Sequence, residues 1–126
     1  MELDTHYIHL AIENKILIGT YKNLVKIDLD AARHIVQERI RFAANRKMPA
    51  MIISGRLVSM DKPARDYLAS AQGTEGLLAC AIIVTSPFAR LLGIYFMSVN
   101  KPPIPVKIFR DTSKAEQWLQ QYIPEH

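Results

Sequence analysis

Two short runs of apolar residues limit what this chain can fold into. Ala50 to Ile53 and Leu78 to Val84 contain no charged side chain, and a stretch with helical spacing follows each of them. Strands that are apolar throughout are typical of parallel sheets, because helices cover both faces of such a sheet. Since strands and helices alternate along this part of the chain, we expect parallel strands joined by right-handed crossovers.

Three further strands are predicted at the two ends of the chain. In the first, residues 6–13, apolar side chains two residues apart form one buried face: Ile8, Leu10 and Ile12. Asn14-Lys15 is expected to form a two-residue turn into residues 16–21, because asparagine tolerates a positive φ. Lysine is a poorer turn residue than glycine, so a longer loop is the alternative. Val106 to Phe109 follows Pro105, which a sheet accepts only at an edge or a strand end. The prediction is an α/β fold with a five-stranded mixed sheet: an N-terminal hairpin, then β-α crossovers.

Four helices are expected to flank this sheet in a single domain, residues 1–126. Asp28 caps the first, which runs to Ala44, and Asp61 with Pro63 opens the second, which Gly73 and Gly76 end. Ser86-Pro87 starts the third, which extends to Val99. Asp111, Thr112 or Ser113 caps the last, where Ser113 and Glu116 fit a capping box.

Arg39 lies within the apolar stripe of the first helix. One interpretation is a side chain that extends past the edge of the core to reach solvent. The other is a partly buried guanidinium paired with a carboxylate such as Asp61 or Asp66. Both interpretations remain open at the level of the sequence.

Composition and charge argue against several classes of protein. The net charge is +4, but the basic residues mostly alternate with acidic ones, so no nucleic-acid footprint is indicated. The chain has one cysteine, Cys80, so an intramolecular disulfide is excluded, and a reducing cytoplasm is the expected location. Because Cys80 lies inside an apolar strand, we expect it to be a core side chain. The first ten residues do not resemble a secretory signal, and no segment is long enough to span a membrane.

The sequence also lacks the motifs of most catalytic and metal sites. The five glycines form no phosphate-binding loop, and Ser54-Gly55 lacks the flanking glycine of a nucleophile elbow. His6 and His9 are three residues apart on a strand, so they point to opposite faces and cannot share a metal. Asp61 has no visible partner that would tune it as a general base. We therefore expect no catalytic residue, no cofactor and no metal.

Polar residues gather where two of the parallel strands end. The carboxyl ends of adjacent strands are where open α/β folds place their binding loops. Loop amides and a helix start there could hold an anion, although Asp61 would oppose it. The candidate residues for binding a ligand or partner are Ser54, Gly55, Arg56, Ser59, Asp61, Lys62, Thr85 and Ser86.

The third helix has an unusual outward face. Its inward face is predicted to bury Phe88, Leu91, Leu92, Tyr95, Phe96 and Val99. On the opposite face Ala89, Gly93, Ile94 and Met97 are small or apolar, and Arg90 alone supplies charge. This face is either a docking surface or a face that neighbouring elements cover.

The chain from about Ile8 to Ile123 resembles the STAS, or SpoIIAA-like, domains, which are named for anti-sigma factor antagonists. The resemblance is closer still to small uncharacterised bacterial proteins of that fold. It rests on residues 64–70, Ser86-Pro87, residues 101–105 and residues 107–109. It implies a mixed sheet flanked by helices, and a role in binding a partner or ligand without catalysis.

The antagonists carry a phosphorylatable serine in an Asp-Ser-Ser-Gly-like motif at the start of the second helix. Here Asp61 matches that motif, whereas Lys62 and Pro63 replace the hydroxyl residues and Ser59 is out of register. The residues that a phosphorylation switch needs are therefore missing at these positions.

Three functions follow, in order of preference. The first is a non-catalytic regulatory module that binds a protein partner or itself, as a dimer. The second is a domain that binds an anionic or lipid-like small molecule. The third is an enzyme, which would need a convergent polar pocket that the sequence does not reveal.

Overall fold

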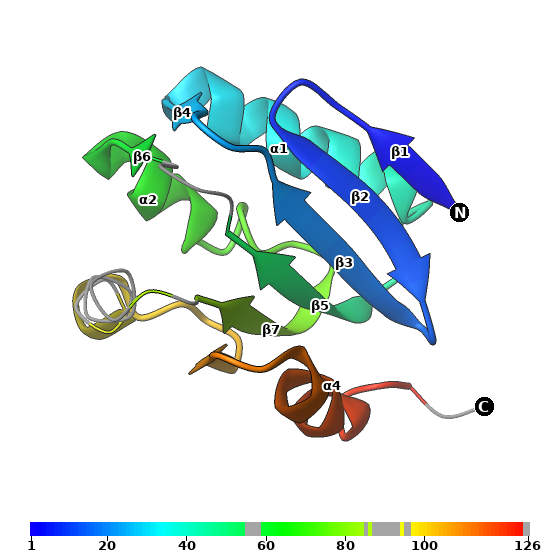
Figure 1. Ribbon diagram of the computed structural model, residues 1–126. Coiled ribbons are helices and arrows are strands. Elements are labelled where there is room, and N and C mark those ends of the chain that lie inside the picture. The colour runs from blue at the N-terminus through cyan, green and yellow to red at the C-terminus, as the bar shows by residue number, and fades with distance from the viewer. Residues whose placement is uncertain (55–58, 85, 87–93, 95–96, 125–126) are drawn as a thin grey trace.

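The computed structural model describes residues 1–54, 59–84, 86, 94 and 97–124 (Figure 1). Its main sheet has six strands in the order β1-β2-β3-β5-β7-β8. Their bounds are β1 Glu2–Asp4, β2 Ile8–Glu13, β3 Ile16–Tyr21, β5 Met48–Ile53, β7 Leu77–Ile83 and β8 Val106–Phe109. β1, β2 and β3 pair antiparallel, and β3, β5, β7 and β8 pair parallel. The predicted mixed sheet is thus confirmed.

The sheet has one strand more than predicted, because β1 adds to the outer edge of β2. Thr5 closes this extra hairpin: its hydroxyl donates to the Ile8 carbonyl oxygen at 2.6 Å, and its oxygen accepts from the Ile8 N–H at 3.1 Å. The three residues of β1 are all exposed, and two of them are acidic. They show no alternation of apolar and polar side chains, so the sequence did not predict this strand.

The predicted turn between β2 and β3 is confirmed. Asn14 and Lys15 both have positive φ, 52° and 65°, and Glu13 pairs directly with Ile16. Two consecutive residues with positive φ are typical of the type I′ turn, whose twist matches that of the strands.

Three helices have described bounds: α1 Leu29–Phe42, α2 Lys62–Leu68 and α4 Thr112–Gln120. Residues 94 and 97–100 are helical as well. Asp28, Asp61 and Asp111 are the N-caps, and each carboxylate accepts a hydrogen bond from a backbone N–H of the first turn. The capping box of Ser113 and Glu116 was wrong, because the N-cap is Asp111, two residues before Ser113, and its carboxylate accepts from the Ser113 N–H.

Two boundaries differ from the prediction for local reasons. α2 ends at Leu68, before either glycine, and Gly73 has another role: an added Cβ there would overlap the Tyr67 carbonyl oxygen. β5 begins at Met48 and so includes Pro49. The register shifts between Met48 and Ala50, and a proline is tolerated within a strand at such a bulge.

The helices form two layers on opposite faces of the sheet (Figure 1). α1 and α2 pack on one face, where the core includes Ile8, Leu10, Leu17, Ala32 and Ile35. α4 packs on the other face, where the core includes Ile16, Met51, Ile83, Ala115 and Leu119. Because β5 contributes Ala50 to one core and Met51 to the other, its predicted burial on both faces is confirmed.

A second, two-stranded sheet lies beside the carboxyl ends of the main strands. β4 (Lys26–Ile27) pairs parallel with β6 (Ser59–Met60), a pairing that the sequence did not predict. In the described part of the chain, no helix combines the length and hydropathy that a membrane span requires.

Candidate functional site

The predicted binding loops do begin side by side. β5 and β7 are parallel neighbours up to the pair Ile53 and Ile83, and the Ser54 N–H donates to the Ile83 carbonyl oxygen at 3.4 Å. Ser54 and Ser86 are both exposed. The other loop candidates Gly55, Arg56 and Thr85 lie outside the described residues.

Ser59 and Asp61 are held by backbone bonds to the segment that precedes α1. The Ser59 N–H donates to the Val25 carbonyl at 3.1 Å, and the Asp61 N–H donates to the Ile27 carbonyl at 3.2 Å. Ile27 is 2% exposed and anchors this small sheet in the core. The loop after β5 is therefore tied back to the start of α1 before α2 begins.

The charged side chains at the start of α2 are bonded within the chain. The Asp61 carboxylate caps the helix through the Ala64 N–H at 2.9 Å. Lys62 donates to Asp66 at 2.7 Å, and Asn100 donates to the other Asp66 oxygen at 2.6 Å. These bonds, to Lys62 first and Asn100 second, lower the pKa of Asp66. Asp61 is thus used as a helix cap, and Lys62, whose side chain is 72% exposed, is paired with Asp66.

Asp66 also connects α2 with the third helix. Its bond to Asn100 joins α2 to the end of the third helix, 34 residues along the chain. This bond brings α2 and the last residue of the third helix together.

The third helix exposes apolar side chains at its described positions. Ile94 is 47% exposed and Met97 is half-buried, and their assignment to an outward contact face stays a prediction. Val99, which was predicted to be buried, is 55% exposed, so the inward prediction was wrong there. Ala89, Arg90 and Gly93 lie outside the described residues.

Neither alternative for Arg39 was correct. The side chain is 6% exposed, and it donates to two backbone carbonyls of the segment after α2: Glu75 at 2.8 Å and Gly73 at 3.1 Å. Asp61 and Asp66 make the other bonds described above. Burial lowers the pKa of Arg39, and the nearby Glu75 carboxylate opposes this shift.

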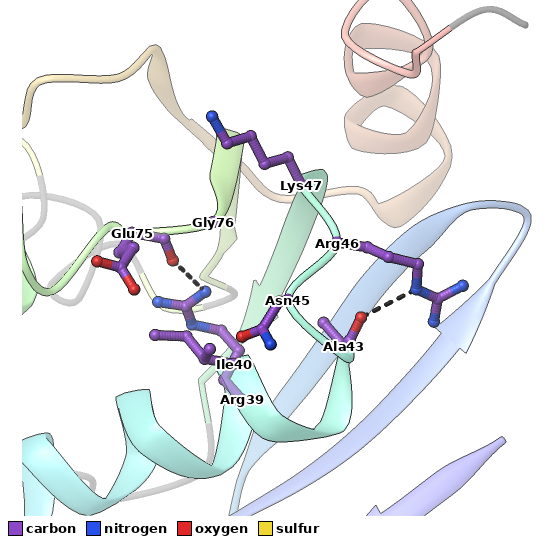
Figure 2. A pocket seen from close by; sticks show the side chains of 8 residues that line it. All are labelled: Arg39, Ile40, Ala43, Asn45, Arg46, Lys47, Glu75 and Gly76. Atoms are coloured by element: carbon purple, nitrogen blue, oxygen red, sulfur yellow. Dashed lines mark hydrogen bonds between the residues drawn. The ribbon is translucent and has the colours of Figure 1, made fainter.

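Arg39 forms the inner wall of a cavity of about 210 Å³ at the end of the sheet opposite to the predicted loops (Figure 2). Its bond to the Glu75 carbonyl joins two of the residues that line the cavity, while the Arg46 and Lys47 side chains extend away from Arg39 in this view. Arg46 is turned aside by its own bond to the Ala43 carbonyl at 2.9 Å. The cavity therefore lacks converging charges. The one feature of the sequence that pointed to this region was Arg39, an arginine within the apolar stripe of α1.

A second cavity, of about 270 Å³, lies where β8 meets α4 and is lined by Ile108, Phe109, Arg110, Asp111 and Lys114. The prediction of binding loops after β5 and β7 did not include this region. Neither of the two cavities is lined by Ser54, Ser59, Asp61 or Lys62.

A polar cluster that the sequence did not predict lies on the exposed face of β1 and β2. His9 is bonded to Glu2 at 2.8 Å and to Asp4 at 3.3 Å, and Lys22 donates to Asp4 at 3.1 Å. The bonds to Glu2 and then Asp4 raise the pKa of His9. The bonds of Asp4 to Lys22 and then His9 lower the pKa of that carboxyl.

The described groups include no obvious reactive centre. Burial raises the pKa of the Cys80 thiol to about 12, so this thiol stays protonated and is a core side chain, as predicted. Among residues 1–54, 59–84, 86, 94 and 97–124, no three metal-ligating side chains lie close enough to hold an ion.

Comparison with solved structures confirms the SpoIIAA-like fold. The chain is similar to an uncharacterized protein of the DUF3478 family with a SpoIIAA-like fold from Shewanella loihica PV-4. The TM-score is 0.65 and the identity 16%, over 94% of this chain and 98% of that one. No curated protein matches the chain significantly. A family model matches residues 10–123, and the chain belongs to the family that this model describes, the domain of unknown function DUF7793.

Proposed function

We propose that this protein is a non-catalytic regulatory module that binds a protein partner or a second copy of itself. The contact surface is the outward face of the third helix, together with the adjacent loop after β5. We also place the module in the cytoplasm, because its one cysteine is buried and cannot form a structural disulfide.

The exposure of Ile94 is the observation that carries this proposal. A large aliphatic side chain that is 47% exposed loses contact with water when a partner covers it, which favours association. Met97 lies three residues further along, so it shares the same side of the helix, and methionine adapts well to different partner surfaces. Val99 is also 55% exposed, but it lies about 140° around the helix from Ile94 and so does not belong to this side.

The bonding of the polar groups near α2 supports a protein contact over a small-molecule site. Lys62, the cation proposed to hold an anionic ligand, is paired with Asp66 at 2.7 Å. The Asp61 carboxylate, the candidate general base, is used as a helix cap. A ligand-binding or catalytic role would have to break these bonds first.

The substitution Ile94→Lys tests the proposal. It places a charge in the centre of the proposed contact, and burying an unpaired charge is strongly unfavourable. We expect Ile94→Lys to abolish concentration-dependent association in sedimentation velocity, or to remove one specific protein from quantitative affinity capture with the tagged chain. The expected weakening is at least about tenfold, which corresponds to about 1.4 kcal/mol.

Gln120→Lys is the matched control, because Gln120 is an exposed polar residue of α4, on the other side of the sheet. It should leave both measurements unchanged. The proposal is wrong if the wild type, Ile94→Lys and Gln120→Lys sediment alike and capture the same proteins in the same amounts.

A further inference from the structure

β8 is an edge strand whose outer backbone groups have no partner among the described residues. It is the last strand of the sheet and pairs with β7 in the described structure (orange in Figure 1). The carbonyls of Pro105 and Phe109 accept from the Cys80 and Val84 N–H groups, both at 2.9 Å. Because backbone groups alternate in direction along a strand, the N–H and C=O groups of Val106 and Ile108 point away from β7.

The surroundings of this edge are basic. Lys107, Arg110 and Lys114 are exposed, and among the described residues none of them makes an ion pair. The Lys107 ammonium lies 5.5 Å from the centre of the Phe109 ring. One carboxylate, Asp111, is also present, but it is engaged as the α4 cap at 2.7 Å from the Ser113 nitrogen.

The 270 Å³ cavity lies at the carboxyl end of this same strand. Ile108 and Phe109 provide its apolar part, and Arg110 and Lys114 its cations. A peptide extended along β8 would therefore reach this cavity at the end of the strand. A side chain of the peptide that follows its last main-chain bond to β8 could enter the cavity.

We propose that β8 binds an extended, acidic segment of a partner protein by strand addition. Main-chain bonds to Val106 and Ile108 provide affinity, and the basic side chains select acidic residues on the added strand. This surface is distinct from the helix face proposed above, and its occupant has a different chemistry.

Charge argues against a second copy as the occupant. Two β8 edges would bring Lys107, Arg110 and Lys114 of both copies together, and like charges across an interface are unfavourable. β1 of a second copy is acidic, but Glu2 and Asp4 are already bonded to His9 and Lys22. The two edges also differ in the sign of their charge: two of the three residues of β1 are carboxylates, whereas the exposed residue of β8 is Lys107.

The test uses a fluorescent peptide of alternating glutamate and valine residues, with a lysine–valine peptide as the charge control. We expect saturable anisotropy with the glutamate peptide that weakens as salt increases, and no binding of the lysine peptide. Hydrogen exchange measured by NMR should slow at the Val106 and Ile108 amides when the glutamate peptide is bound.

Two variants separate the contributions. Ile108→Pro removes an outward N–H without breaking a bond to β7, and it should weaken binding by about tenfold. The double variant Lys107→Glu, Lys114→Glu should abolish binding of the glutamate peptide. It leaves the main-chain groups of β8 unchanged, so it tests the proposal even if the proline variant misfolds. Lys47→Glu, an exposed lysine before β5, is the control and should bind nearly as the wild type does.

The proposal is overturned by any of three results: no binding of the glutamate peptide, equal binding of both peptides, or protection elsewhere than at β8. Peptide-independent protection of Val106 and Ile108 in a dimer would instead identify a second copy as the occupant and would also refute it. Because Ile94 is not part of this edge, Ile94→Lys should leave peptide binding unchanged.

Discussion

Arg39 joins two segments through backbone carbonyls. Its guanidinium reaches from α1 to Gly73 and Glu75, in the connection between α2 and β7. Charge-assisted hydrogen bonds of this kind are stronger than neutral ones, and a buried carbonyl that loses its donor carries a desolvation cost. Gly76, with φ of 84°, lets the chain turn beside this side chain without a Cβ. Arg39 thereby orders a connection that has no regular secondary structure.

We predict that Arg39→Met lowers the free energy of unfolding by about 1.5–3 kcal/mol, the range for losing hydrogen bonds to a charged group. The methionine keeps the apolar stem of the arginine, so the change reports mainly on the two bonds. Urea denaturation measures it as a lower midpoint. Arg41→Met, at an exposed position two residues further along α1, should cost less than about 1 kcal/mol. Equal losses in both variants would contradict the assigned role.

At the scale of the element, β1 depends on side chains more than on packing. All three of its residues are exposed, and it contributes none of the buried core residues described. Thr5 closes its hairpin, and His9 and Lys22 hold its two carboxylates. A short strand of this kind stays in place through local bonds, and such bonds open more readily than a packed core.

The pairing of β1 should therefore depend on pH. The pKa of His9 is raised above 6.5 in the folded chain, so protonated His9 stabilises β1 fully below pH 6.5. This contribution is lost as the pH rises through the raised value. The lowered pKa of Asp4 acts in the opposite direction: its contribution is present above pH 3.8 and is lost as the pH falls through the lowered folded value.

Hydrogen exchange of the Leu3 amide measures this effect. After correction for intrinsic rates, protection should fall between slightly acidic and slightly alkaline buffer. His9→Gln should flatten the dependence, because glutamine does not titrate. His34→Gln is the control, since His34 is an exposed residue of α1 bonded to the Asp30 carbonyl. A pH dependence that survives in His9→Gln would show that another group is responsible.

At the scale of the whole molecule, two cores share one sheet. α1 and α2 cover one face, and α4 is the described cover of the other. β5 and β7 lie between them, and both contact α4. Because the same strands line both cores, unfolding one face removes the support of the other.

We predict that Leu119→Ala costs about 2–5 kcal/mol, because Leu119 is 0% exposed and its truncation leaves a cavity under α4. Trp118, the single tryptophan, reports on α4 by fluorescence, and circular dichroism reports on the whole chain. The two urea transitions should coincide in the wild type and move together in the variant. Gln120→Ala should shift neither by more than about 0.5 kcal/mol. A tryptophan transition that precedes the loss of secondary structure would contradict a shared core.

Local chemistry made several parts of the fold predictable. Asp28 and Asp61 were identified as caps because a carboxylate before a helical pattern can satisfy free N–H groups. Asn14-Lys15 was identified as a turn because of its place between two strands. Ile52 and Cys80 were assigned to buried strands because apolar runs without charges are rare elsewhere. Each of these depends on neighbours within a few residues.

The candidate site was predictable only in part, because its bonds join distant segments. Asp66 is hydrogen-bonded to Asn100, Arg39 is hydrogen-bonded to Gly73, and Ser59 is the strand partner of Lys26. The two residues of each pair are more than 30 positions apart in the sequence. No periodicity in the sequence records such pairs.

Residue type and spacing by themselves determined that this chain forms a mixed sheet between helices, because apolar burial and capping act locally. The tertiary structure alone decided which charges are engaged, that β1 joins the sheet, and that β8 ends it with backbone groups that have no partner in the described part of the chain. Those outcomes depend on which distant segments meet, and only the closed fold brings them within the few ångströms over which hydrogen bonds act.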